Sequence, residues 1–124
     1  MKWFAAHNIF YHRFKDGSQS TYPVWENIYL VEAAGFEEAH AKATELGTQG
    51  AGDHSGTLRF EDRPAELVFV GVRKIVSCSE EDKRPADGTE ITYSDLEVSD
   101  RASLEDLAQG RTVLVTYRSA DDDE

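Results

Sequence analysis

The run ELVFVGVRKIVSC, residues 66–78, decides the fold because apolar and β-branched side chains occupy most of its positions. Its apolar residues form two alternating sets, Val68, Val70, Val72 and Val76 on one face and Leu67, Phe69 and Ile75 on the other. Valine at this density is unfavourable in a helix and packs well on a pleated sheet. The run therefore predicts a strand.

Two earlier runs are also typical of strands. Residues 3–14 carry aromatic and apolar side chains at both parities, which indicates a strand covered on each side for at least part of its length. Asp16-Gly17 follows as a turn signal, since glycine supplies the positive φ of a tight turn. Residues 24–33 again favour a strand. We expect these two runs and residues 66–78 to be the central strands of one sheet.

The clearest helix is predicted over residues 36–46. Its single apolar stripe consists of Phe36, Ala39, Ala43 and Leu46. Gly35 opens this helix, Glu38 lies four residues before Lys42, and Gly47 is the expected C-terminal cap. A helix with one apolar face needs a sheet beneath it, so we expect it to pack on the central strands.

Weaker patterns complete the fold. Residues 57–61 and 112–118 alternate and predict strands nearer the sheet edges, and residues 90–93 begin a further strand. Ser103 with Asp106 matches a capping box before a short helix. The fold class is α+β: a mostly antiparallel sheet, one main helix packed on it, and a second short helix near the C-terminus.

The chain has 124 residues, enough for one hydrophobic core and too few for two. We therefore predict a single domain over residues 1–118 and an acidic disordered tail over residues 119–124. The 13 Lys and Arg residues against 24 Asp and Glu residues give a net charge of −11. This charge argues against a nucleic-acid partner or an anionic membrane and favours a basic protein partner.

Cysteine content and the start of the chain bear on the compartment. Cys78 is the single cysteine, so no internal disulfide and no paired zinc spacing exist, and we expect a buried, unreactive thiol. His7 and Asn8 interrupt the first apolar run before it reaches the length of a secretory signal. We expect a cytoplasmic protein with no membrane association, no metal and no cofactor.

Several segments occur in a characteristic order: Trp3-Phe4-Ala5, Glu26-Asn27-Ile28-Tyr29-Leu30-Val31, Phe36-Glu37-Glu38-Ala39, Val68-Phe69-Val70-Gly71-Val72 and Asp87-Gly88-Thr89-Glu90. This order resembles an uncharacterised family of small, mostly bacterial proteins, known only as a domain of unknown function. The resemblance covers most of residues 1–97. Because the family has no established activity, the resemblance implies no catalytic residue.

Candidate catalytic side chains are few: His7, Glu26, Glu32 and His54. Glu26 and Glu32 interrupt an apolar strand surface at one parity, and His7 or Tyr29 could complete a pocket with them at the sheet edge. The alternative is a strand end that rises into solvent. His54 lies in Asp53-His54-Ser55, the three side-chain types of a hydrolase triad, but three consecutive residues cannot normally form that geometry.

Two hypotheses of function remain open. The first is a non-catalytic protein-interaction module whose acidic surface binds an unidentified, basic protein partner. The alternative is a small enzyme or small-ligand-binding domain with a pocket at the sheet edge. We prefer the first because no catalytic motif is present. We also expect the unpaired edges of strands 57–61 and 112–118 to support a homodimer.

Overall fold

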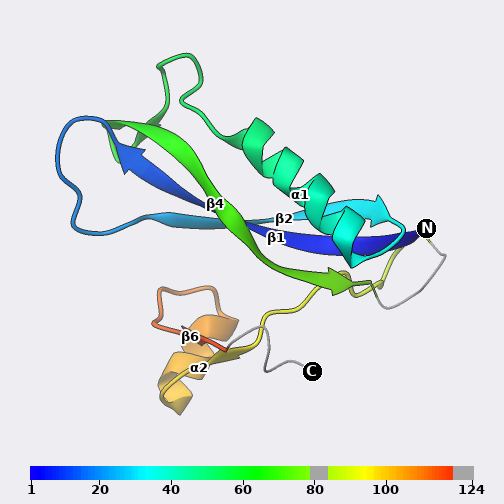
Figure 1. Cartoon of the computed structure of the whole chain (residues 1–124). Helices are drawn as coiled ribbons and strands as arrows, with labels where there is room; N and C mark the ends of the chain where they lie inside the picture. The colour runs from blue at the N-terminus through cyan, green and yellow to red at the C-terminus, as the bar shows by residue number, and fades with distance from the viewer. Residues whose placement is uncertain (79–83, 119–124) are drawn as a thin grey trace. The chain divides into compact units, whose positions relative to one another are not determined.

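The computed structural model describes residues 1–78 and 84–118 (Figure 1). The chain divides into two compact units, Met1–Thr92 and Tyr93–Glu124, and each is described by itself. The acidic tail expected over residues 119–124 lies outside the described residues. The single domain expected over residues 1–118 stays a prediction.

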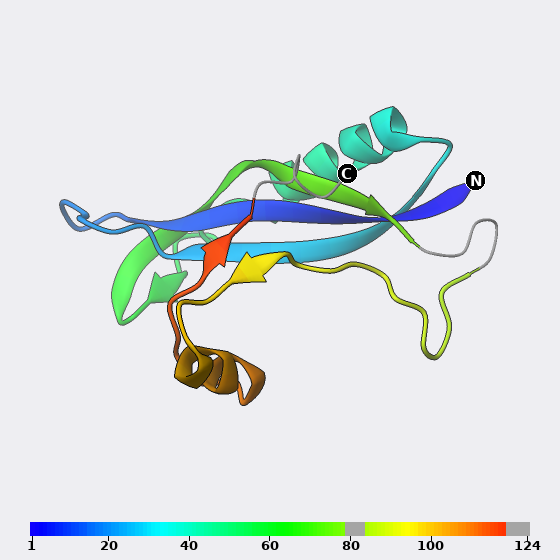
Figure 2. The ribbon, with the colours of Figure 1, turned by 90° about the horizontal axis from the view of Figure 1, so that it is seen from below.

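The first unit is a four-stranded sheet with one helix. In chain order it contains β1 (Lys2–Phe14), β2 (Val24–Ala33), α1 (Phe36–Gly50), β3 (Arg59–Phe60) and β4 (Arg63–Ser77). The strands lie in the order β2-β1-β4-β3, and every neighbouring pair is antiparallel. Figure 1 shows α1 across one face of the sheet, and Figure 2 shows β1 between β2 and β4. The predicted α+β class, with a short second helix later in the chain, is confirmed.

The core lies between α1 and the face of the sheet that it covers. Its buried centre consists of Phe4, Val31, Ala33 and Ala39, with Leu46 and Ile75 packed against it. These residues come from all three long strands and from the predicted apolar stripe of the helix. The ring of Phe36 is half-exposed and meets that of Phe4 edge-on, with 5.0 Å between centroids.

The helix is longer than predicted, because Gly47 does not end it. α1 continues to Gly50, and Gly47 is buried inside it. A Cβ atom at this position would lie 2.4 Å from Cε1 of Phe69, so glycine lets the helix approach β4 closely. Gly35 does open the helix as predicted. A close tertiary contact, and not a cap, explains Gly47.

The positions of the strands correct one prediction and confirm another. Residues 24–33 were expected in the centre of the sheet, but β2 is an edge strand. The apolar side chains on one of its faces remain partly exposed, which an edge position allows. Residues 57–61 were expected at an edge, and β3 is indeed the other edge of this sheet.

The second unit contains β5 (Leu96–Glu97), α2 (Arg101–Ala108) and β6 (Thr116–Tyr117), and its two strands pair in an antiparallel manner. The strand expected over residues 112–118 is thus reduced to two residues, and residues 90–93 form no strand. The cap of α2 also differs from the prediction. Asp100, not Ser103, is the N-cap residue, and its side chain accepts a hydrogen bond from the Ser103 backbone N–H at 2.7 Å.

Candidate functional site

β2 is an edge strand, and only one of its sides pairs with another strand in the part of the chain that the structure describes. The backbone N–H of His12 donates to the Pro23 carbonyl at 2.9 Å, in register with the β1–β2 ladder. Because antiparallel residues alternate in direction, odd-numbered β2 residues bond to β1 and even-numbered ones direct their backbone groups outward. The carbonyl of Glu32, an even-numbered residue, does point outward, because it accepts a hydrogen bond from Lys42 Nζ at 2.5 Å.

Exposed apolar side chains lie along the outer edge of β2. Among the described residues, no strand pairs with the outer side of β2. Ile28 and Leu30, whose backbone groups direct outward, also have side chains that are 45% and 42% exposed. Free backbone donors and acceptors beside exposed apolar side chains form a template on which another strand can pair.

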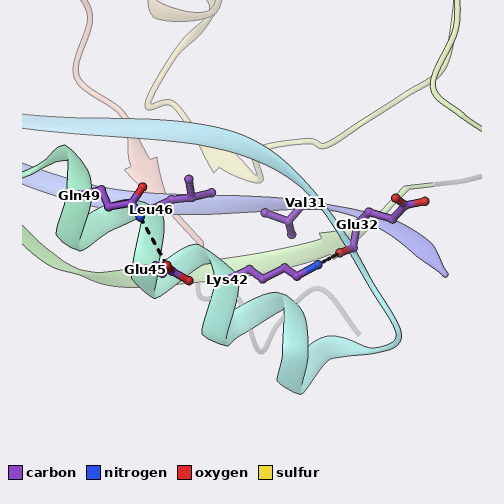
Figure 3. Close-up of a pocket in the computed structure, with 6 residues that line it drawn as sticks. All are labelled: Val31, Glu32, Lys42, Glu45, Leu46 and Gln49. Carbon is purple, nitrogen blue, oxygen red and sulfur yellow. Dashed lines mark hydrogen bonds between the residues drawn. The ribbon is translucent and has the colours of Figure 1, made fainter.

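A groove runs between β2 and α1 on the face that the helix covers (Figure 3). It encloses about 290 Å³ and is lined by Val31, Glu32, Lys42, Glu45, Leu46 and Gln49. Val31 and Leu46 provide its apolar part. Figure 3 shows Lys42 and Glu32 at one end of the groove and Glu45 with Gln49 at the other. Gln49 Nε2 donates to Glu45 Oε1 at 3.4 Å.

The rim of this groove is acidic. Two exposed glutamates lie along α1 at this groove: Glu45, which lines it, and Glu38, which pairs with its lysine. Lys42 is the lysine that lines the groove, and it forms an ion pair with Glu38 at 3.7 Å. The negative charges therefore exceed the positive ones along this edge, which favours a cationic ligand.

A second polar cluster lies on the sheet face opposite α1. His7 is fully buried on β1, and its Nδ1 lies 2.7 Å from Oε2 of Glu26 on β2. Its Nε2 is hydrogen-bonded to Oγ1 of Thr92. Arg73 Nε lies 3.7 Å from the same Glu26 oxygen. The structure thus joins two of the sequence candidates, His7 and Glu26, and adds Thr92 and Arg73.

A β-bulge brings Arg73 to this cluster. The β1–β4 register pairs His7 with Lys74 but Asn8 with Val72, so Arg73 is an extra residue in β4. An extra residue locally changes the direction of the side chains on its strand. The positive charges of Arg73 and Lys74 each act to lower the pKa of His7, as its burial does.

The protonation of His7 follows from its surroundings. Burial lowers the pKa of His7 below its usual range, although the hydrogen bond to Glu26 acts in the opposite direction. The neutral imidazole then donates from Nδ1 to the Glu26 carboxylate and accepts the Thr92 hydroxyl proton at Nε2. Hydroxyl, imidazole and carboxylate occur here in the order of a nucleophile, a base and its orienting acid.

Comparison with known families identifies the chain. A family model described as a domain of unknown function, DUF4288, matches residues 3–94. The chain belongs to the DUF4288 family. The resemblance expected from the ordered segments is therefore confirmed. No curated protein and no solved structure matches this chain. The DUF4288 segment contains β2, α1 and the His7 cluster, and ends before β5.

The remaining sequence candidates of the DUF4288 domain lie elsewhere. Glu32 lines the groove with its backbone carbonyl, which accepts from Lys42, and its side chain shares the parity of Ile28 and Leu30. Tyr29 has the opposite parity and lies on the helix side, near Gly50. His54 is exposed in the loop between α1 and β3, with a left-handed φ of 52°. Asp53 accepts from the Gly56 N–H at 3.1 Å and pairs with Lys15, so this loop holds its own turn together.

Sequence reasoning missed the other members of both sites. Thr92 is separated from His7 by 85 residues, and no spacing rule connects them. Arg73 and Lys74 gave a usable signal, because two consecutive charges interrupt an apolar strand where the bulge occurs. Glu45 and Leu46 were assigned to the helix, but their role in the groove depends on where α1 lies.

The described residues offer little support for a reactive thiol, a metal site or a membrane span. Cys78 is buried as predicted, and burial raises the pKa of its thiol, which disfavours the reactive thiolate. Within residues 1–78 and 84–118, no three His, Cys, Asp or Glu side chains gather closely enough to hold a metal ion. Neither described helix combines the length and the apolar character that a membrane span needs.

Proposed function

We propose that this DUF4288 domain is a non-catalytic protein-interaction module that binds an extended, basic segment of a partner protein as an added strand beside β2. The observation that carries the proposal is the open β2 edge with the groove at its side. In strand addition, main-chain hydrogen bonds provide affinity, and pockets for alternate side chains provide specificity. This edge offers both.

Charge supports a basic partner over a second copy of this chain. The net charge is −11, and Asp121–Glu124 supply only four of the negative charges. An antiparallel pair of β2 strands centred on Tyr29 would place Glu26 of one copy opposite Glu32 of the other. Like charges directly opposite each other destabilise a strand pair. A basic segment would instead relieve the repulsion along this edge.

The experiment is a selection of extended peptides from a random display library on the whole protein. Selected peptides should lose at least tenfold in affinity for a Leu30→Pro variant, because proline removes an outward N–H. Leu30→Ala keeps that N–H and is the matched control, and it should retain most of the affinity. Urea denaturation of both variants checks that each one folds.

Two results would overturn the proposal. One is a set of selected peptides that bind Leu30→Pro as tightly as they bind the unaltered protein. The other is a set of acidic peptides, since the glutamates of this edge would repel them. Basic peptides that bind only when the Leu30 N–H is present would support strand addition.

The Thr92–His7–Glu26 geometry favours one second candidate function, hydrolysis of an activated acyl ester. Thr92 Oγ1 would attack the acyl carbon, its proton would pass to His7 Nε2 and then to the leaving alcohol, and water would release the acyl group. Turnover of p-nitrophenyl acetate that Thr92→Val abolishes and Thr92→Ser preserves would support this enzyme. Equal rates for the unaltered protein, Thr92→Val and Thr92→Ser would exclude this enzyme. The cluster would then serve only to attach residue 92 to the sheet.

A further inference from the structure

We infer that the partner strand carries lysine or arginine at the positions that face α1, and apolar residues at the alternate positions. This inference rests on the proposed function and adds the side-chain chemistry of the partner. Side chains along a strand alternate between its two faces. A strand added beside β2 therefore directs every second side chain toward the face that α1 covers, where the groove between β2 and α1 can hold one of them.

The groove fits a long cationic side chain. Its apolar part, Val31 and Leu46, can cover a methylene stem, while the charged end reaches the carboxylate of Glu45. Lysine and arginine bury their stems along apolar surface in this way and keep their charged ends at a polar rim. A volume of about 290 Å³ is sufficient for one such side chain.

Glu45 is the acceptor that remains available. Lys42 is engaged at the other end of the groove, by the Glu32 carbonyl at 2.5 Å and by the Glu38 carboxylate at 3.7 Å. The hydrogen bond to Glu45 in the structure comes from Gln49 at 3.4 Å, which is long for such a contact. A cationic group in the groove would make a shorter, charge-assisted bond with Glu45.

Other side chains fit this groove less well. An acidic side chain would meet Glu45 and Glu38 with the same charge. A purely apolar side chain would take water from the Glu45 carboxylate without replacing the lost hydrogen bonds. On the opposite face, the alternate side chains of the added strand would lie beside Ile28 and Leu30, where apolar residues bury further surface.

The test uses three ten-residue peptides and the whole protein. One peptide alternates valine with lysine, the second is the same peptide with every lysine acetylated, and the third alternates valine with glutamate. Acetylation keeps the stem and removes the charge. We expect the lysine peptide to bind about tenfold more tightly than the acetylated one, and the glutamate peptide not to bind.

Two matched variants distinguish binding in the groove from a general attraction between a basic peptide and an acidic protein. Glu45→Gln and Glu37→Gln each remove one negative charge from α1, but only Glu45 lines the groove. Glu45→Gln should reduce the affinity of the lysine peptide about fivefold and leave that of the acetylated peptide unchanged, whereas Glu37→Gln should change neither by more than about twofold.

The outcomes distinguish the inference from the proposed function. If the lysine and acetylated peptides bind equally and both are lost in Leu30→Pro, strand addition is correct and the cationic assignment is wrong. The assignment is also wrong if Glu45→Gln and Glu37→Gln weaken the lysine peptide equally. If Leu30→Pro affects neither peptide, strand addition at β2 is itself wrong.

Discussion

The two edges of the four-stranded sheet differ in almost every property that controls strand pairing. β3 is two residues long, and Arg59 on it donates through Nη1 to the Asp62 carbonyl at 3.0 Å. Glu61 and Asp62 then adopt left-handed φ angles of 52° and 63°, which turn the chain directly into β4. β2 has ten residues, no lysine or arginine, and exposed apolar side chains.

This difference shows which edge is protected and which is available. Proteins commonly protect an edge by shortening it, adding charge or turning the chain away, and β3 shows all three features. β2 shows none of these features along its centre, around Ile28 and Leu30. An unprotected edge of this length is a hazard unless it has a partner, which is why we assign the function to β2.

The helix that makes the β2 edge a groove depends on Phe69. Its ring occupies the space beside Gly47 and lies 5.5 Å from the ring of Phe10. Phe69→Ala should lower the free energy of unfolding by about 3 kcal/mol, because a large, partly buried ring packed under α1 leaves a cavity. Urea denaturation measures this change. A loss below about 1 kcal/mol would show that Phe69 does not hold α1 on the sheet.

Gly47→Ala should have the next largest effect. The new Cβ would lie 2.4 Å from Phe69, so we expect a loss of about 1–3 kcal/mol in the free energy of unfolding. In the Phe69→Ala background the same change should be neutral or stabilising by up to about 1 kcal/mol, since alanine favours helix over glycine. An equal loss in both backgrounds would contradict the contact.

His12 connects the two edges and makes stability depend on pH. It is buried, its ring stacks on Phe60 of β3 at 4.3 Å, and it meets Trp25 of β2 edge-on at 4.5 Å. Burial lowers the pKa of His12, so the unfolded chain binds its proton more readily. Its stabilising contribution is therefore complete above the ordinary value of 6.5 and decreases as the pH falls below it.

A His12→Phe variant tests this link. Phenylalanine keeps the ring contacts and does not titrate, so the loss of stability between pH 7.5 and pH 5.5 should become smaller. A residual loss should remain, because the pKa of His7 is lowered in the same direction. Urea denaturation at both pH values measures the two slopes. Identical slopes in the variant and the unaltered protein would contradict a neutral, buried His12.

The smallest effect is expected at the β3 edge. Arg63 forms an ion pair with Asp16 at 2.7 Å and lies over the ring of Phe14, and it holds the pKa of Asp16 below its usual range. Asp16→Asn should reduce stability slightly at low salt and not at 1 M NaCl, where the attraction is screened. Peptide binding at β2 should not change. A stability loss that persists at high salt would point to packing and not to charge.

Local pattern was sufficient for the three long strands, but not for their positions in the sheet or for the short strands. Residues 3–14, 24–33 and 66–78 form β1, β2 and most of β4, because alternation within a strand is a local property. The edge position of β2 depends on pairing with distant residues. The prediction that Gly47 ends the helix was wrong for the same reason. A glycine near the end of a helix resembles a cap, whereas its contact with Phe69 depends on a distant strand.

The site was predicted in part. The parity of Glu26 on its strand directed attention to a carboxylate on an apolar surface, and the structure pairs it with His7. Thr92 could not be assigned, because a hydrogen bond across 85 residues leaves no spacing signal. The consecutive charges Arg73 and Lys74 marked the bulge in β4 but did not show that Arg73 reaches Glu26. The groove could not be predicted, because it depends on α1 lying beside β2. The apolar stripe of the helix shows that it packs on the sheet but not over which strand.

Amide hydrogen exchange on β2 tests strand addition at this edge most directly. The N–H groups of Ile28 and Leu30 direct outward, while those of Asn27 and Tyr29 bond to β1 and serve as internal controls. Addition of the valine–lysine peptide should slow exchange at Ile28 and Leu30 at least tenfold and leave Asn27 and Tyr29 unchanged. Binding of the peptide with no new protection at Ile28 and Leu30, or with protection at Arg59 and Phe60 instead, would contradict the assignment of β2 as the docking edge.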